Sequence, residues 1–323
     1  MSQSHTSEVK IINIETWIEE NKKYFLPPIC HKVSYLINLI KIIKNTLNIV
    51  SKLMHNEQLI MIFVGGPNDR EDFHIEEGEE LFYQIKGDMC VKIVENGKHK
   101  DIIIKEGELF LLPAKVAHSP RRYADSIGLV IERRRLPNEL DGIRWFIPNT
   151  VDPLYQKWFH CKDLGTELVP LIKEYFASNE YKTKQPSGST DISFNPFDLN
   201  NVLIDRQKHG AYNLLNRIKS SSNDSTKIIN LTPDELNLQF NVTVFKKGEH
   251  EIKSNGIDEW FWQLDGTSTL AISDSSSTFN LIKFDSIYVP ADKFTTINIK
   301  LDDESSYLIR ISQDPSNLNI SLD

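Results

Sequence analysis

Residues 80–87 read Glu-Leu-Phe-Tyr-Gln-Ile-Lys-Gly, and residues 259–266 repeat this pattern as Glu-Trp-Phe-Trp-Gln-Leu-Asp-Gly. A second pair of segments follows in the same order and at nearly the same offset. Residues 107–114 read Gly-Glu-Leu-Phe-Leu-Leu-Pro-Ala, and residues 284–291 read Phe-Asp-Ser-Ile-Tyr-Val-Pro-Ala. One such match is compatible with chance, but two in one order indicate that the two halves of the chain are duplicated.

Short apolar runs surround the first octapeptide and predict β-strands. Turn signals such as Gly-Gly-Pro-Asn at 65–68 separate the runs, as is typical of a small antiparallel barrel or jelly roll. The same pattern returns in the second half. We therefore predict a mainly β fold of two jelly-roll barrels packed together, with a helical connecting segment and a degenerate second barrel. The expected strands of the first barrel are residues 59–64, 81–85, 90–94, 102–104, 109–112 and 128–131.

Helical spacing of apolar residues occurs at two places. Residues 13–21 form the first predicted helix, with Asn13 as its N-cap, and residues 153–178 form the second, interrupted near Gly165. A polar stretch follows the second helix and predicts a linker. The predicted divisions of the chain are a catalytic domain at 1–180, a linker at 181–200 and a second domain at 201–323.

The composition limits the class of partner. The chain has 323 residues, a formal net charge of -8 and a pI near 5.7, without a block of five basic residues. A nucleic-acid binder needs a basic surface and a membrane span needs a long apolar segment, so small molecules are the expected partners. The three cysteines, Cys30, Cys90 and Cys161, form no CxxC pair, which favours packed thiols in a reducing cytosol.

Three residues in the first predicted barrel are of types that bind a metal. His74 precedes a predicted strand, Glu80 begins it, and His118 follows another strand. Side chains that alternate inward from different strands converge in a small barrel, so these three can meet. Two imidazoles and one carboxylate form the open triad of non-haem Fe(II) oxygenases, but zinc accepts the same ligands for hydrolysis. The plain alternative is a pair of surface histidines beside a solvated acidic loop at 76–80.

The second copy serves as an internal control for this site. Glu259 matches Glu80, whereas a threonine falls opposite His118. His250 lies nine residues before Glu259, where the first copy has a spacing of six, so it is a poor match for His74. We therefore expect one metal site, in the first domain only.

Two spacings around these residues resemble the cupin pattern. Glu80 is followed after six residues by Gly87, and Gly107 is followed after five residues by a proline and then by His118. Glu76 stands where many cupins have a further metal histidine. This departure leaves three ligands instead of four.

Segments along nearly the whole chain further resemble the 3-hydroxyanthranilate 3,4-dioxygenase family, in the single-chain, two-cupin form found in animals. The smaller bacterial form carries a further iron site with CxxC pairs, which are absent here. The matching segments are residues 63–68, 83–84, 110–114, 118–120, 130–133, 139–142, 157–165 and 312–315.

This resemblance implies an activity and a metal. The family opens the ring of 3-hydroxyanthranilate with O2 and gives 2-amino-3-carboxymuconate semialdehyde, the precursor of quinolinate in NAD biosynthesis through the kynurenine pathway. Carried over by motif position, His74, Glu80 and His118 hold Fe(II). The expected partners are therefore 3-hydroxyanthranilate and O2, and neither nucleic acid nor a membrane.

The same carry-over assigns the residues around the metal. Arg70 lies beside the dioxygen site, and Arg122 and Glu132 contact the substrate together with Glu80. A planar guanidinium suits the substrate's carboxylate, and Glu132 can accept its phenolic proton. The alternative for Arg70, Arg122 and Glu132 is a surface network of salt bridges beside the arginines at 133–135.

Residues 33–52 interrupt the resemblance. Fourteen of these twenty residues are Ile, Leu, Asn or Lys, and none is Gly, Pro, Ala or acidic. A/T-rich codons favour such residues, and Val33-Ser34 can be encoded by a splice-donor sequence. Two interpretations stay open, an unspliced intron in the gene model and a true inserted amphipathic helix.

Two other functions compete with a dioxygenase. One is a non-catalytic bicupin that binds a small aromatic acid, and the other is a zinc-dependent cupin isomerase or hydrolase. A second barrel without metal ligands is expected to cover apolar surface of the first barrel, as a second subunit would. That role favours a monomer.

Overall fold

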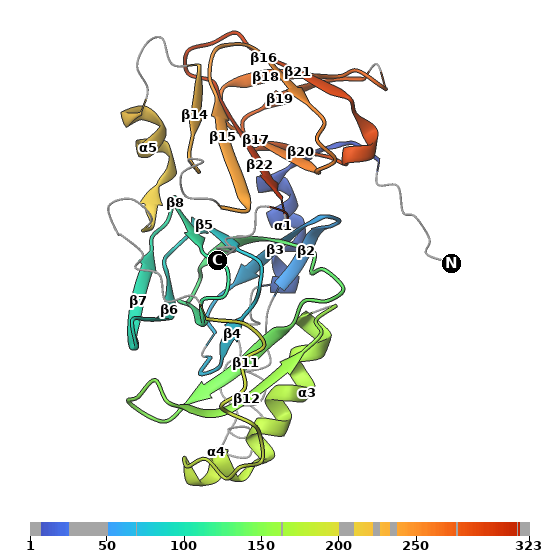
Figure 1. The fold of residues 1–323 in the computed structure, drawn as a ribbon. Helices are drawn as coiled ribbons and strands as arrows, with labels where there is room; N and C mark the ends of the chain where they lie inside the picture. The colour runs from blue at the N-terminus through green and yellow to red at the C-terminus, as the bar shows by residue number, and fades with distance from the viewer. Residues whose placement is uncertain are drawn as a thin grey trace. The chain divides into compact units, whose positions relative to one another are not determined.

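The computed structural model describes residues 8–25, 51–68, 70–162, 164–199, 210–221, 227–232, 238–275, 277–314 and 316. These residues lie mainly in β-strands and divide into two compact units (Figure 1). Of the described residues, those between 23 and 55 and between 60 and 214 belong to the first unit, called the first barrel, and those up to 22, at 56–59 and from 215 on belong to the second barrel. The predicted mainly β class is confirmed.

Two six-stranded sheets form the first barrel. Their strands are β2 (Ser51–Asn56), β3 (Leu59–Gly65), β4 (Phe73–Ile75), β5 (Glu80–Lys86), β6 (Met89–Glu95), β7 (Lys98–Ile104), β8 (Glu108–Leu112), β9 (His118–Arg122), β10 (Ile127–Arg133), β11 (Asp141–Phe146), β12 (Pro153–Phe159) and β13 (Tyr212–Asn213). One sheet has the order β13-β8-β5-β10-β3-β2, and the other has the order β12-β11-β4-β9-β6-β7. All six predicted strands are present. Strands β2, β4, β9, β11 and β13 were not predicted; β4 has only three residues, and β9 is rich in polar residues.

The apolar core of the first barrel determines which way the polar side chains point. Phe82 on β5 stacks with Phe110 on β8, with 6.3 Å between ring centroids, and Val130 on β10 belongs to the same buried cluster. Residues two apart on a strand share a face. Glu80 therefore points to the same side as Phe82, and Glu132 points to the same side as Val130.

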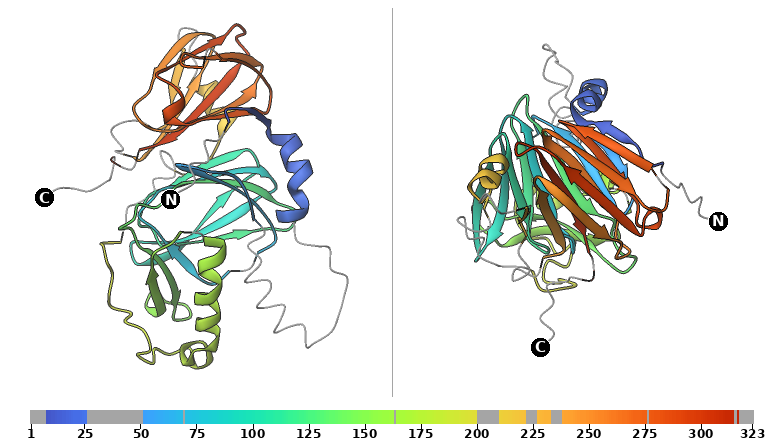
Figure 2. Two further views of the ribbon diagram at one scale, coloured as in Figure 1. Left: turned by 90° about the vertical axis from the view of Figure 1, so that its right-hand side faces the viewer. Right: turned by 90° about the horizontal axis from the view of Figure 1, so that it is seen from above.

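The predicted helix at 153–178 is wrong in its first part. Residues 153–159 form strand β12, which pairs with β11, and helix α3 (Leu164–Ala177) begins only after them. Trp158 and Phe159 match helical spacing, but aromatic residues also favour strands, and pairing with β11 decides the outcome. Helix α3 packs on β11 and β12 (Figures 1 and 2). The buried residues of this contact are Ile143, Trp145, Leu154, Tyr155, Leu168, Ile172 and Tyr175.

The segment after α3 is held against the first barrel. The predicted linker at 181–200 begins inside a short helix, α4 (Asn179–Thr183). Beyond α4, the side-chain amide of Gln156 donates to the carbonyl oxygens of Asp191 at 2.8 Å and Phe194 at 2.7 Å. Most of the insertion at 33–52 falls on residues 26–50, which lie outside the described residues, so neither interpretation of it is tested.

The second barrel is also built from two sheets. Its elements are β1 (Ile11–Asn13), α5 (Leu214–Ser220), β14 (Ile228–Asn230), β15 (Phe240–Phe245), β16 (Gly248–Lys253), β17 (Glu259–Asp265), β18 (Thr267–Ile272), β19 (Ser277–Ile282), β20 (Asp285–Val289), η2 (Ala291–Lys293), β21 (Thr296–Leu301) and β22 (Tyr307–Gln313). The sheet orders are β1-β20-β17-β22-β15-β14 and β16-β21-β18-β19. An apolar cluster that includes Phe261, Leu270 and Ile297 fills its interior.

Corresponding strands of the two barrels pair in the same way, as the repeated octapeptides indicate. Strand β5 pairs with β8 and β10, and strand β17 pairs with β20 and β22. The first residue of each octapeptide lies opposite the last residue of its partner strand; the pairs are Glu80 with Leu112 and Glu259 with Val289. A left-handed glycine ends both octapeptides, with φ of 62° at Gly87 and 66° at Gly266. These shared features support the internal duplication.

The N-terminal residues differ from the predicted domain division. Helix α1 (Ile14–Phe25) covers the predicted helix, and Asn13 Oδ1 accepts a hydrogen bond from the Thr16 N–H at 3.1 Å, as an N-cap does. Strand β1, however, pairs with β20. Residues 8–22 therefore group with the second barrel, although we expected residues 1–180 to form the first domain.

Two of the three cysteines lie in the described residues. Cys90 and Cys161 are free and buried, and burial raises the pKa of both thiols. Cys30 lies outside the described residues. Among the described helices, none combines the length and the apolar content that crossing a membrane requires.

Gly66→Ala is expected to destabilise the first barrel by about 1–3 kcal/mol, the usual range for overpacking. A Cβ at this position would lie 2.0 Å from the carbonyl oxygen of Tyr123 and 2.6 Å from Ser126 Oγ. Gly78→Ala is the control, because the nearest atom to its Cβ would be 3.7 Å away. Urea unfolding of both variants measures the difference, and equal stability would contradict this packing.

Candidate metal centre

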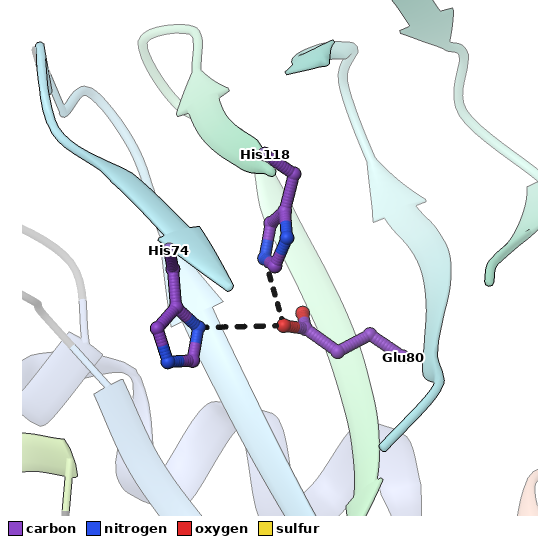
Figure 3. Close-up of side chains that lie close together, drawn as sticks. All are labelled: His74, Glu80 and His118. Atoms are coloured by element: carbon purple, nitrogen blue, oxygen red, sulfur yellow. Dashed lines mark ion pairs between the residues drawn. The ribbon is translucent and has the colours of Figure 1, made fainter. Parts of the chain in front are cut away.

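Three side chains converge inside the first barrel (Figure 3). His74 on β4 lies directly opposite His118 on β9, and their ring centroids are 5.5 Å apart. Glu80 comes from β5 in the other sheet, and its Oε1 lies 2.8 Å from His118 Nε2 and 3.8 Å from His74 Nδ1. One ligand atom from each residue lies within 4.8 Å of the others, and all three residues are buried. The fold therefore brings the predicted triad together.

The far nitrogen of each imidazole is held by a hydrogen bond. His74 Nε2 lies 2.7 Å from Asp141 Oδ2, and His118 Nδ1 lies 3.0 Å from the carbonyl oxygen of Val116. Partners of this kind orient histidine ligands and fix the tautomer, which leaves the other nitrogen free to bind a metal. Both remaining nitrogens face Glu80. The three residues thus fit a divalent transition-metal ion.

A second group of carboxylates overlaps this triad. Glu76, Glu80 and Glu132 also have ligand atoms within 4.8 Å of one another. Arg135, however, contacts both Glu76 and Glu132. Their carboxylates are therefore engaged, and the group with two imidazoles is the better metal site.

The charges of the triad depend on its burial and its partners. Burial lowers the pKa of His74, but hydrogen bonds with Asp141 and Glu80 outweigh it and raise the pKa to about 9. Burial also opposes the charged form of Glu80, but His118 and Glu76 hold its pKa well below the usual value. A metal ion would take the place of the proton on His74, since ligands bind metals in their deprotonated form.

Arg135 is the centre of an ion-pair network behind the triad. Its side chain is 10% exposed, and Nη2 lies 2.5 Å from Glu76 Oε2 and 3.0 Å from Asp141 Oδ2. Its Nε donates to Asp141 Oδ1 at 3.3 Å, and its Nη1 contacts Glu132 Oε2. Glu132 is buried, and burial raises its pKa above the usual value although Arg135 lowers it. One guanidinium therefore links three buried carboxylates.

Arg122 is buried, and no counterion for it lies among the described residues. Its side chain makes no ion pair within the described part of the chain, and its Nε is buried without a hydrogen-bond partner. Burial and the nearby Arg70 lower its pKa to about 10, while Glu80 raises it. Burying a guanidinium is costly unless an anion pairs with it, so Arg122 is suited to bind an anionic group.

Asn68 holds the backbone on which Arg122 sits. Its Oδ1 accepts a hydrogen bond from the Arg122 N–H at 2.6 Å, and its own N–H donates to the Arg122 carbonyl oxygen at 3.2 Å. Its Nδ2 donates to the carbonyl oxygen of Pro120 at 3.2 Å. The loop after β3 is thereby fastened along β9.

Arg70 comes from that same loop. Its Nε lies 3.1 Å from Asp72 Oδ2, and Asp72 and Glu80 raise its pKa although burial opposes the charge. Unlike Arg122, it has a carboxylate partner within the protein. Arg70 is therefore near Glu80 but is held by Asp72.

All six residues that the sequence singled out lie in this one region. The alternative was a salt-bridge network at the surface. Glu132 does form a salt bridge with Arg135, but Arg70, Arg122 and Glu132 are all buried, so this network is not at the surface. Sequence reasoning missed Asp141 and the position of Arg135. The segment 139–142 contains Asp141 and was among the family-like segments, but nothing in the sequence showed that it would lie beside His74.

The second barrel has different partners at the matching carboxylate. Arg310 Nε donates to Glu259 Oε2 at 2.7 Å, so a guanidinium is paired with the residue that matches Glu80. His250 Nε2 lies 2.8 Å from the carbonyl oxygen of Lys246. Both groups of potential metal ligands found among the described residues lie in the first barrel.

Comparisons with known proteins identify the family. A family model described as 3-hydroxyanthranilic acid dioxygenase matches residues 44–176. The 3-hydroxyanthranilate 3,4-dioxygenase of Xenopus tropicalis is 44% identical, over 86% of this chain and 90% of that protein. The enzyme of the same name from Homo sapiens is 38% identical, over 94% of this chain and 96% of that protein.

Among solved structures, a cupin 2 conserved barrel domain protein from Leptotrichia buccalis superposes with a TM-score of 0.48 at 15% identity, over 96% of this chain and 99% of that one. The sequence relatives are much closer, and they extend over most of both chains. Identity at this level and coverage shows that the chain belongs to the 3-hydroxyanthranilate 3,4-dioxygenase family.

Proposed function

We propose that this protein opens the aromatic ring of 3-hydroxyanthranilate with O2, using Fe(II) held by His74, Glu80 and His118. The product would be 2-amino-3-carboxymuconate semialdehyde, the precursor of quinolinate, with both oxygen atoms of O2 incorporated. When bound, Fe(II) would supply open coordination positions and the redox chemistry that O2 requires. Family membership and the buried triad support this proposal.

The observation that carries the substrate assignment is the unpaired guanidinium of Arg122. It is buried and close enough to Glu80 and Arg70 for their charges to affect its pKa. A guanidinium binds a carboxylate through two parallel charge-assisted hydrogen bonds. The carboxylate of 3-hydroxyanthranilate would pair with this guanidinium, which would place the adjacent hydroxyl and amino groups of the substrate towards the triad.

Glu132 is proposed to accept the phenolic proton. Its carboxylate is buried within 4.8 Å of Glu80, and burial raises its pKa towards the range in which a carboxylate can act as a general base. Arg135 holds it in place. Arg70, held by Asp72, is proposed to border the position of O2. The cytosolic location and the monomeric state stay predictions, and a solution mass measurement tests the latter.

The activity is tested by loading the metal-free protein with Fe(II) under anaerobic conditions and then adding 3-hydroxyanthranilate and air. We expect a ring-opened chromophore and one O2 consumed for each product formed. The same protein loaded with Zn(II) should give neither signal. Fully loaded iron without product would refute the substrate, and turnover by the zinc form without O2 would favour a hydrolase or isomerase.

His118→Ala is expected to remove iron binding and turnover together. Loss of a residue that only orients a ligand costs about 10–100-fold in affinity, so loss of a ligand should weaken Fe(II) binding by at least about 100-fold. His250→Ala in the second barrel is the control and should keep both properties. Chelator competition measures the affinity, and full iron binding by His118→Ala would exclude the triad.

Arg122→Ala is expected to raise KM by about 10–100-fold, because charge-assisted hydrogen bonds contribute about 1.5–3 kcal/mol. Fe(II) affinity should change by only a few-fold. Arg122→Lys keeps the charge without the planar fork, so its KM should lie between those of the alanine variant and the wild type. A larger loss of iron binding than of substrate binding would contradict a role in holding the substrate.

A further inference from the structure

We propose that Arg135 is a positioning residue of the metal centre, which holds Asp141 in the orientation that fixes the His74 ring. This inference rests on the triad of the proposed function as the metal site. It concerns how strongly that triad binds a metal, so it does not depend on the identity of the substrate.

The contacts form a chain from the guanidinium to the metal ligand. Arg135 Nη2 lies 3.0 Å from Asp141 Oδ2, and the same oxygen lies 2.7 Å from His74 Nε2. Arg135 Nε also donates to Asp141 Oδ1 at 3.3 Å, so the carboxylate is gripped at both oxygens. Asp141 is fully buried, and its position therefore depends on these partners. His74 Nδ1 then faces Glu80 at 3.8 Å.

The positive charge of Arg135 also offsets the negative charges of the carboxylates around it. Glu76, Glu132 and Asp141 are buried and all contact this guanidinium. Without it, the carboxylates would repel one another and Glu80, and Asp141 would lose the partner that opposes its movement away from His74. A lysine can supply the charge, but its single ammonium cannot make the separate contacts that three nitrogens of Arg135 make.

Arg133 offers a comparison from the same segment of chain. It is buried and paired with Glu139, with Nη1 donating to Glu139 Oε2 at 2.7 Å. Its Nη1 also donates to the carbonyl oxygen of Arg134 at 3.3 Å, and its Nη2 donates to the carbonyl oxygen of Glu77 at 3.4 Å. A change of Arg133 therefore perturbs a buried ion pair with Glu139 in the same segment of chain.

The test measures Co(II) binding to metal-free protein by competition with a chromophoric chelator, with no substrate present. Arg135→Lys and Asp141→Asn should each weaken Co(II) binding by about 10–100-fold, the usual effect of losing a partner of a histidine ligand. The double variant should bind Co(II) only slightly less tightly than the single variant with the lower affinity, because both changes break the same chain of contacts. The visible Co(II) spectrum should shift in the same way in both single variants.

Arg133→Lys is the matched control. This variant should lower the melting temperature, because it weakens the buried ion pair between Arg133 and Glu139. Its Co(II) affinity should stay within about twofold of the wild type, because Arg135 and Asp141 are unchanged. Should Arg135→Lys fail to fold, Arg135→Gln, which keeps a donor towards Asp141 without the charge, is measured instead. Unchanged Co(II) affinity in a folded Arg135 variant, or additive losses in the double variant, would overturn the inference. If the wild-type protein binds Co(II) but does not open the ring when it is fully loaded with Fe(II), the proposed function is refuted, and the test of Arg135 still holds.

Discussion

The site depends on the register of one short pair of strands. His74 on β4 lies opposite His118 on β9, and a shift of either strand by one residue would turn its histidine to the other face of the sheet. The pairing of β11 with β4 places Ile143 opposite His74, and Asp141, two residues before Ile143 and on the same face, lies beside the His74 ring. The positions of the two histidines and of Asp141 are therefore fixed by backbone hydrogen bonds.

That register places many charged groups in a confined space. Glu76, Glu80, Glu132 and Asp141 are all buried, and such carboxylates are tolerated only when they are paired. Arg135 pairs with three of these carboxylates, Glu76, Glu132 and Asp141. The imidazoles of His74 and His118 lie beside the fourth, Glu80. Arg122 has no such partner in the part of the chain that the structure describes, so this guanidinium is suited to bind an anionic ligand.

The two barrels show how one strand pattern can serve two purposes. In the first barrel the carboxylate that begins the repeated octapeptide faces two histidines, whereas in the second it is paired with Arg310. A bidentate guanidinium can satisfy a buried carboxylate without a metal. The second barrel therefore keeps the pairing of its strands and its apolar core, although its polar residues differ.

Much of this molecule follows from local patterns in the chain. The duplication, the strands with alternating apolar residues, the helix that begins after Asn13 and the three candidate ligands could all be inferred from the sequence, because spacing and residue type are local properties. Three features could not be inferred from the sequence. They are the strand at 153–159, the attachment of residues 8–22 to the second barrel and the position of Asp141. Each of these depends on a partner strand far away in sequence. Tertiary structure alone determined that Asp141 and Arg135 stand behind His74 and that Arg122 has no ion-pair partner among the described residues, since contacts between distant strands and the burial of charge arise only when the sheets close around them.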